Sequence, residues 1–365
     1  MEDIRIIFSG VKDPRVEGRC KHLLSDILFI GLCTLLSNGE DFEDMVAFAE
    51  EREDWLRTKI ELPNGIPSHD TFNRVFQLID SKQLTKVLGE DGQALLDHIE
   101  GQLINIDGKK IKGVSPASKG NEGLYILSAW VSEQEICMGQ LPVDDKSNEI
   151  FSIPDLLDEI EIKGSTVSID AIGCQVEIAK KIIKKEADYL LALKKNQKGL
   201  FEEIKEAFAQ FSGQQHRDNW EMDHGRIERR NCTILDAKEV LGPKKLKQWP
   251  ALNTLIMVEA HRVMKDTKSL QTRFYISSRT GCTAETYNKM VRSHWSIENK
   301  LHYHLDVTFS EDASRARSNN APENLNIMRK LALRRIAKDD SKLSKKKRRF
   351  KASMNIQYLE KLLRL

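Results

Sequence analysis

The sequence predicts an α/β domain preceded by an all-α N-terminal domain. Two observations carry this prediction. Apolar residues recur at helical spacing through about the first 95 residues. From about residue 100, three short apolar runs follow one another, and strand-like runs then alternate with helix-like segments. A chain of 365 residues is long enough for two or three domains that each have a core.

Residues 1–95 are expected to form the helical N-terminal domain. Residues 25–36 are apolar on nearly every side, which indicates a buried helix. Pro63-Asn64-Gly65 breaks the chain, and Ser68 or Asp70 can then cap a further helix. A short turn before a capped helix is compatible with a helix-turn-helix DNA reader, but a plain helical bundle is the interpretation that we favour.

Residues 96–336 are expected to contain the sheet. The expected elements are, in order, strands at 103–107, 124–131 and 135–141, a helix at about 150–160, a strand ending at 170, a helix from about 175 and a strand at 189–193. The second and third strands are joined by a connection of hairpin length. Three antiparallel strands followed by alternating helix and strand is the order expected of a ribonuclease-H-like domain.

Two further segments complete the expected organisation. Residues 199–272 interrupt the alternation and are expected to be a β-rich insertion, after which a strand at 273–277 and a helix at about 284–301 follow. Residues 337–365 are expected to be a basic C-terminal tail, either solvated and partly disordered or a phosphate-binding arm, with some helix returning at 356–363.

Three acidic residues far apart in sequence are the candidate catalytic and metal-binding residues. Asp107 and Asp170 each end a strand-like run, and the carboxyl ends of strands in such a sheet face the ligand crevice. Glu298 lies on the last expected helix near His294 and Trp295, and these neighbours argue against a solvent-facing position. Carboxylate oxygens suit hard divalent cations. Taken singly, the three residues also fit a turn, a helix cap and a solvated helix position.

The composition narrows the class of protein. The net charge of +2 does not itself indicate a nucleic-acid partner. The six cysteines are scattered without a Cys-x-x-Cys pair, which argues against a zinc ribbon or a disulfide framework. The most apolar stretch, residues 27–36, is too short to span a bilayer, and the N-terminus does not read as a signal peptide. We therefore expect a cytoplasmic protein without a membrane partner.

Short motifs occur along most of the chain in a characteristic order. They include Asn105-Ile-Asp-Gly-Lys-Lys110, Ser168-Ile-Asp-Ala171, His224-Gly-Arg-Ile-Glu228 and His294-Trp-Ser-Ile-Glu-Asn-Lys-Leu-His302. Together they resemble the DDE-class insertion-sequence transposases, specifically the H-repeat-associated subgroup. The resemblance implies that Asp107, Asp170 and Glu298 form the catalytic triad of a ribonuclease-H-like domain.

The chain departs from the wider group of related transposases near the glutamate. Those proteins commonly carry Tyr, Arg and Lys at seven and four residues before it and seven after, whereas this chain has Val291, His294 and Leu305. Trp295 matches an aromatic residue found three positions before the glutamate. The departure leaves open whether excision passes through a DNA hairpin.

The resemblance also implies a mechanism and partners. Two Mg²⁺ ions, for which Mn²⁺ can substitute, are expected at the triad, with Asp107 bridging both. Hydrolysis at the element end would free a 3′-OH that then joins target DNA. The implied partners are double-stranded DNA with terminal inverted repeats, target DNA and a second copy of the chain on DNA. A silent DNA-binding remnant and a metal-dependent nuclease without strand transfer are the alternatives.

Basic and aromatic residues around the triad are candidate DNA contacts. They are Lys109, Lys110, Lys194, Lys195, Arg226, Arg229, Arg292, His294 and Trp295. Asp312 is the alternative to Glu298 as third acid. For His302 and His304 we favour packing or phosphate contact over a nitrogen-rich transition-metal site.

Overall fold

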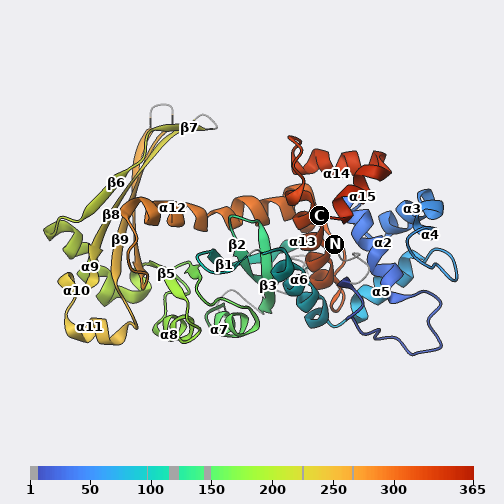
Figure 1. Ribbon diagram of the computed structural model, residues 1–365, viewed down its shortest axis with the longest axis horizontal. Coiled ribbons are helices and arrows are strands. Elements are labelled where there is room, and N and C mark those ends of the chain that lie inside the picture. The colour runs from blue at the N-terminus through green and yellow to red at the C-terminus, as the bar shows by residue number, and fades with distance from the viewer. Residues whose placement is uncertain (1–6, 97, 115–122, 144–148, 224–225, 265–266) are drawn as a thin grey trace.

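The computed structural model of the protein describes residues 7–96, 98–114, 123–143, 149–223, 226–264 and 267–365. The molecule is elongated, with the strands of the insertion at one end and helices from both chain termini at the other (Figure 1). The central sheet lies between them. Among the described residues, no helix combines the length and the apolar character needed to cross a bilayer.

The N-terminal segment is helical, as the sequence predicts. Its helices are α2 (Leu24–Leu36), α3 (Phe42–Glu51), α4 (Glu53–Arg57), α5 (His69–Leu78) and α6 (Ser81–Leu95). Every residue of α2 except Ser25 is buried, because this helix lies at the centre of the helical body. Ser68 caps α5 by accepting a hydrogen bond from the Thr71 backbone N–H.

The first five strands have the ribonuclease-H-like arrangement. They are β1 (Leu103–Ile111), β2 (Leu124–Val131), β3 (Ile136–Val143), β4 (Thr166–Ile169) and β5 (Asp188–Leu193). Their order in the sheet is β3-β2-β1-β4-β5. The pairs β1–β2 and β2–β3 are antiparallel, whereas β1–β4 and β4–β5 are parallel. Helices α7 (Glu149–Glu159) and α8 (Val176–Lys184) cover one face (Figure 1).

The β-rich insertion extends this same sheet. β10 (Thr267–Ser277) pairs antiparallel with both β5 and β9 (Thr254–Met264). The sheet then continues through β8 (Arg226–Asp236) to β6 (Gln214–Arg217) and β7 (Glu221–Asp223). Helices α9 (Lys198–Gln210), α10 (Ala237–Val240) and α11 (Pro243–Gln248) accompany these strands. Helix α12 (Ala284–His294) leads back toward the helical body (Figure 1).

The C-terminal residues are folded, where the sequence suggested a basic tail. After α13 (Ala321–Lys338), residues 345–363 form α14 (Lys345–Met354) and α15 (Ile356–Leu363). Leu359 and Leu362 of α15 and Leu325 and Leu331 of α13 belong to the same hydrophobic core as α2. The helical body is therefore built from both ends of the chain.

Candidate active site

The sheet brings the two aspartates together. Ile106 of β1 pairs in parallel register with Ile169 of β4, so Asp107 and Asp170 follow at the same edge of adjacent strands. Asp107 remains within β1 and pairs with Ser128 of β2. Asp170 comes directly after β4, and its Oδ1 accepts a hydrogen bond from the Ile172 backbone N–H at 3.0 Å. The register therefore places Asp107 and Asp170 on neighbouring strands, as the sequence predicts.

Glu298 reaches the same edge from a π-helix. The expected α-helix at 284–301 ends at His294, and a π-helix (Ile297–His302) follows it. A π-helical turn holds an extra residue and recurs at functional sites. The Glu298 side chain is 54% exposed, which differs from the expected shielded position. Its apolar neighbours Ile297 and Leu301 take up the buried face of the turn.

His302 completes the constellation, although the sequence favoured packing or phosphate contact for it over a place in a metal site. Its Nδ1 lies 3.4 Å from Oε2 of Glu298 and 3.7 Å from Oδ2 of Asp107. One possible ligand atom from each of these three residues lies within 4.8 Å of the other two. The signal available in the sequence was the four-residue spacing from Glu298 to His302, which places both on one face of a helix.

The electrostatics of this site favour a cation. Burial, followed by the nearby carboxylates of Glu298 and Asp170, raises the pKa of Asp107 to about 8. Hydrogen bonding and charge from His302 instead lower the pKa of Glu298. The carboxylates of Glu298 and Asp170 thus disfavour the charged form of Asp107, and a divalent ion would supply the compensating positive charge.

A fourth acid lies behind Asp107. Glu149, the first residue of α7, is 6% exposed. It packs against Gly108 so closely that a Cβ at Gly108 would lie 2.3 Å from Glu149 Oε1. Glu149 also contributes to raising the pKa of Asp107. The Asp107-Gly108 pair is therefore not a turn. It lies inside a strand, where the absence of a Cβ at Gly108 lets the Glu149 side chain approach the backbone.

Two of the predicted DNA contacts are directed into the protein. Lys109 is buried, and its Nζ lies 2.7 Å from Oδ1 of Asp306 and 2.8 Å from Oε2 of Glu311. His294 is 7% exposed, and its Nδ1 lies 3.0 Å from the hydroxyl of Ser168. Both side chains support the strands of the site from within, so neither offers a free group to a phosphate.

Asp312, the alternative third acid, belongs to the network around Lys109. Its Oδ2 lies 3.0 Å from Nζ of Lys112, and its Oδ1 lies 3.8 Å from Nζ of Lys109. A carboxylate held by two lysines is already neutralised. Glu298 is the acid that the fold places beside Asp107.

The other predicted contacts are exposed or, for Lys110 and Arg229, half-buried. Lys194 and Lys195 are exposed directly after β5. Lys110 lies over the ring of Tyr125, at 5.5 Å from its centroid. Arg229 lies over Trp220 at 4.5 Å, and Arg292 donates to Glu221 at 2.9 Å. The side chain of Arg226 and the motif residues His224 and Gly225 lie outside the described part of the chain.

A basic cavity adjoins Glu298. It has a volume of about 320 Å³ and lies between the insertion strands and α12. Its lining includes Arg230, Arg262, Arg273, Trp295 and Glu298. Trp295 is 42% exposed, and the guanidinium of Arg273 lies over its ring at 4.5 Å. Arginine and exposed tryptophan beside an acid site are suited to contacts with nucleic acid.

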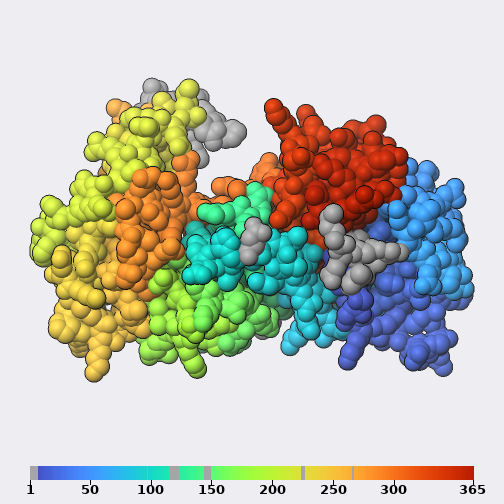
Figure 2. All heavy atoms as spheres, viewed as in Figure 1, coloured from blue at the N-terminus to red at the C-terminus, as the bar shows by residue number. Residues whose placement is uncertain are grey.

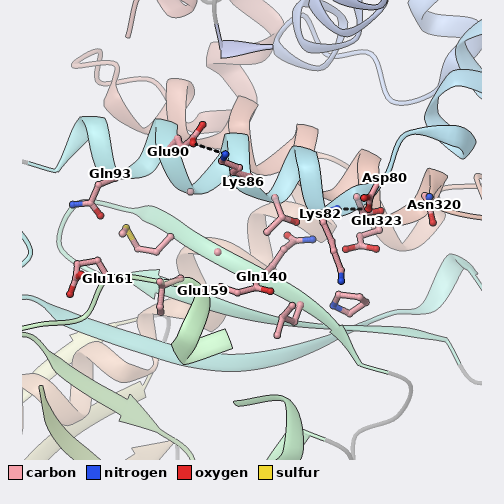
Figure 3. Close-up of a pocket in the computed structure, with 18 residues that line it drawn as sticks. Asp80, Lys82, Lys86, Glu90, Gln93, Gln140, Glu159, Glu161, Asn320 and Glu323 are labelled. Carbon is pink, nitrogen blue, oxygen red and sulfur yellow. Dashed lines mark hydrogen bonds and ion pairs between the residues drawn. The ribbon is translucent and has the colours of Figure 1, made fainter. Parts of the chain in front are cut away.

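A larger cavity lies away from this site, between α6 and β3 (Figure 3). It has a volume of about 630 Å³. Five carboxylates line it against two lysines, namely Asp80, Glu90, Glu159, Glu161 and Glu323 against Lys82 and Lys86. An acidic lining repels phosphates, so size does not identify the nucleic-acid site.

Comparison with known proteins identifies related families and sequences. A family model described as "Transposase DDE domain" matches residues 99–334, and one described as "DDE_Tnp_1-associated" matches residues 6–90. The chain is 36% identical to "Putative transposase YncI" of Escherichia coli O157:H7, over 97% of this chain and 93% of the relative. It is 33% identical to "H repeat-associated putative transposase YhhI" of Escherichia coli strain K12, over 100% of this chain and 97% of the relative.

One solved structure shows a slight likeness. It is the "Cryo-EM structure of piggyBac transposase synaptic complex with hairpin DNA", with a TM-score of 0.45 and 13% identity. The match covers 98% of this chain and 78% of that chain. This likeness is too slight to carry an inference about function.

Proposed function

This chain belongs to the DDE transposase family, and from that premise we propose that it is an active, metal-dependent DNA transposase. The proposed reaction is phosphodiester hydrolysis at the ends of an insertion element, followed by transfer of the freed 3′-OH into target DNA. One observation carries this proposal. Asp107, Asp170 and Glu298 converge at one sheet edge, and their proximity contributes to raising the pKa of Asp107 to about 8.

The residues present fit a pair of divalent ions. Asp107 interacts with both of the other acids and would contact both ions, while Asp170 and Glu298 would each hold one. When bound, such ions make water a better nucleophile and stabilise the leaving oxygen of a phosphodiester. An all-carboxylate set favours Mg²⁺, and Mn²⁺ has compatible ligand preferences.

The protein residues hold this set in place. Antiparallel β2 and parallel β4 flank β1 on its two sides, which limits the movement of Asp107. His302 lies beside the Glu298 carboxylate, and Ile297 and Leu301 bury the apolar side of the same turn. A set held on paired strands and a packed helix is preorganised for catalysis.

The proposed DNA contacts are the predicted basic and aromatic residues that remain on the surface. These are Lys110, Lys194, Lys195, Arg229, Arg292 and Trp295. Arg273, which stacks on Trp295, joins them. Lys109 and His294 are left out because both are buried. Joining two element ends requires two active sites, so we also propose that the protein acts as a homodimer on DNA.

The test is cleavage of DNA that carries the terminal repeats flanking the element, with Mg²⁺ or Mn²⁺. Wild type is compared with Asp170→Asn, Asp107→Asn and Glu298→Gln. We expect metal-dependent nicking at the element ends by wild type, a loss of at least about 1,000-fold in each variant, and retained DNA binding.

Pre-cut ends then separate the alternatives. Joining of a pre-cut 3′-OH to a target plasmid supports the transposase, while cleavage without joining identifies a nuclease. DNA binding without cleavage by wild type, beside an active control transposase, would identify a silent remnant and overturn the proposal.

A further inference from the structure

Helix α14 carries the densest positive charge of any described helix. Its ten residues include Lys345, Lys346, Lys347, Arg348, Arg349 and Lys351, and none of the ten is acidic. A run of this kind in a disordered tail is solvated and carries little information. In this protein the run is helical, so its positive charges have fixed directions.

The two arginines of α14 are directed inward and anchor the helix. Arg349 is fully buried, and its Nε donates a hydrogen bond to the Leu35 carbonyl at 2.8 Å. Its Nη2 donates to the Gly39 carbonyl at 2.8 Å, and its guanidinium lies 4.2 Å from the centroid of the Phe309 ring. Arg348 donates to the Ile336 carbonyl at 2.6 Å. These arginines therefore stabilise the packing of α14, and their guanidinium groups are already engaged by backbone carbonyls.

The lysines of α14 are directed outward. Lys346, Lys347 and Lys351 are exposed. Within the described part of the chain, Lys346 and Lys347 have no side-chain hydrogen bond or ion pair. Lys351 lies over the ring of Tyr358, at 4.2 Å from its centroid. Among the described residues, Lys346 and Lys347 thus have no internal partner that explains their charge, whereas Lys351 has only the Tyr358 ring.

A shared carboxylate joins α14 to the π-helix of the acid site. Glu135, in the turn between β2 and β3, accepts from Nζ of Lys345 at 2.6 Å. Its other oxygen lies 3.1 Å from Nζ of Lys300, two residues after Glu298. The first turn of α14 is thereby tied to the segment that positions the proposed third acid.

The C-terminal helices, which include α14, border a hollow on the surface. Figure 2 shows this hollow between the C-terminal helices, in red, and the strands of the insertion, in yellow-green. Helix α12 runs from the insertion toward the helical body behind it (Figure 1). The proposed contacts in this part of the fold are Arg229 of β8, Arg273 of β10 and Arg292 of α12. The elements on the two sides of the hollow, α14 and the insertion strand β8, both carry several basic residues.

We propose that Lys346, Lys347 and Lys351 of α14 bind the phosphate backbone of double-stranded DNA, opposite the insertion. This inference rests on the proposed function, because it assumes that the substrate at the acid site is DNA. Lysine is a compact charge that neutralises phosphate without reading bases. The contact is therefore independent of sequence, and it holds a duplex beside Glu298.

Phe350 and Met354 lie on the same outer face, at 57% and 70% exposed. A helix face of lysines with apolar residues also occurs in proteins that bind anionic membranes. DNA is the partner that we argue for, because Glu135 ties the first turn of α14 to the turn that carries Glu298, and because the insertion across the hollow is also rich in arginine. Membrane binding is kept as an outcome of the test.

The test compares full-length wild type with Lys346→Gln/Lys347→Gln. Glutamine keeps the helix propensity, and neither lysine supports the fold through a hydrogen bond. Lys244→Gln/Lys247→Gln on α11 is the matched control, because it removes the same charge from exposed lysines away from the hollow (Figure 1). Binding of a duplex of unrelated sequence is measured in EDTA across a salt series.

Loss of two phosphate contacts should reduce the log–log salt slope by about 1.8, since each contact contributes about 0.9. If the variant and wild type bind equally at 1 M salt, a slope difference of about 1.8 corresponds to an affinity about 60-fold lower for the variant at 0.1 M salt. The control pair should change neither value by more than its error. Equal behaviour of the two double variants would overturn the inference, as would unchanged DNA binding with lost binding to phosphatidylserine vesicles. The binding assay in EDTA does not depend on catalysis. A failure of cleavage in the separate nicking assay would therefore count against the proposed function and not against the role of α14.

Discussion

His302 is the buried histidine beside the acids of the candidate active site. Its ring is buried, and Nδ1 faces both Glu298 and Asp107. Nε2 is also buried, and it has no hydrogen-bond partner among the described residues. We infer that His302 is a positioning residue for Glu298, with a direct ligand role as the alternative.

Replacing His302 with glutamine should weaken metal binding and cleavage by about 10- to 100-fold, because groups that orient metal ligands have effects of this size. Metal affinity is measured by titration with Mn²⁺, independently of turnover. His304→Gln is the control, since His304 Nδ1 instead lies 2.9 Å from the Thr308 hydroxyl. Wild-type Mn²⁺ affinity in His302→Gln would contradict the positioning role.

Some of the site could be predicted from sequence, and the reason differs by residue. Asp107 and Asp170 follow apolar strand runs, so their position at a sheet edge follows from the strand pattern. Lys109 and His294 have the right chemistry for DNA, but their burial depends on Glu311 and Ser168, which lie 202 and 126 residues away in sequence. Such long-range partners leave no local signal.

At the scale of elements, regular strands and helices were predictable, while the irregular ones were not. The expected strands 103–107, 124–131 and 189–193 coincide with the cores of β1, β2 and β5. The change from α12 to a π-helix leaves the apolar pattern almost unaltered, so periodicity cannot reveal it. The helical form of residues 345–354 was hidden by their charge, because Arg348 and Arg349 are charged yet inward-facing.

Helices α6 and α13 are joined by a buried ion cluster. The carboxylate of Asp91 accepts from Nη1 of Arg335 at 2.7 Å and also pairs with Arg334. All three side chains are less than a tenth exposed. Burial disfavours the charged carboxylate, but the hydrogen bonds and charges of the two arginines outweigh it and lower the pKa of Asp91.

Replacing Asp91 with asparagine should destabilise the protein by about 3–5 kcal/mol at pH 7, because two arginines remain buried without their counter-ion. Since folding lowers the pKa of Asp91, its contribution is present above the unfolded value of about 3.9 and is lost as pH falls through the folded value. The difference between variant and wild type should therefore shrink below about pH 4. Urea unfolding at several pH values measures both effects.

Glu90→Gln on the same helix is the control for this experiment. Glu90 pairs with Lys86 at 3.6 Å, and both side chains are more than half exposed. Exposed pairs of this kind contribute only about 0–1 kcal/mol. An Asp91→Asn effect as small as that of Glu90→Gln would show that the cluster is not what couples α6 to α13.

At the scale of the whole molecule, the two ends of the chain share one core. Residues of α2, α13 and α15 pack in the same hydrophobic cluster, although the sequence placed them in separate segments. Polar contacts reinforce this junction, since Trp55 Nε1 donates to Glu360 Oε1 at 2.9 Å and Lys59 pairs with the same carboxylate at 2.8 Å. The sequence suggested domain boundaries near residues 95 and 337. Such boundaries follow from changes along the chain, and they do not show which helices pack against one another.

Removing residues 345–365 should therefore abolish cooperative folding, rather than trim a tail. The deletion withdraws Tyr358, Leu359 and Leu362 from the core and leaves the carbonyls of Leu35 and Gly39 without Arg349. Burying one large apolar side chain contributes about 1.5–3 kcal/mol, so three account for a large part of a total stability of about 5–15 kcal/mol. Circular dichroism during heating should show a broad or absent transition in the truncated chain.

The full-length Lys346→Gln/Lys347→Gln variant, which alters only the outer face of α14, should melt as sharply as wild type. A sharp transition of the truncated chain near the wild-type midpoint would mean that the N-terminal helices and α13 form a sufficient core without α14 and α15.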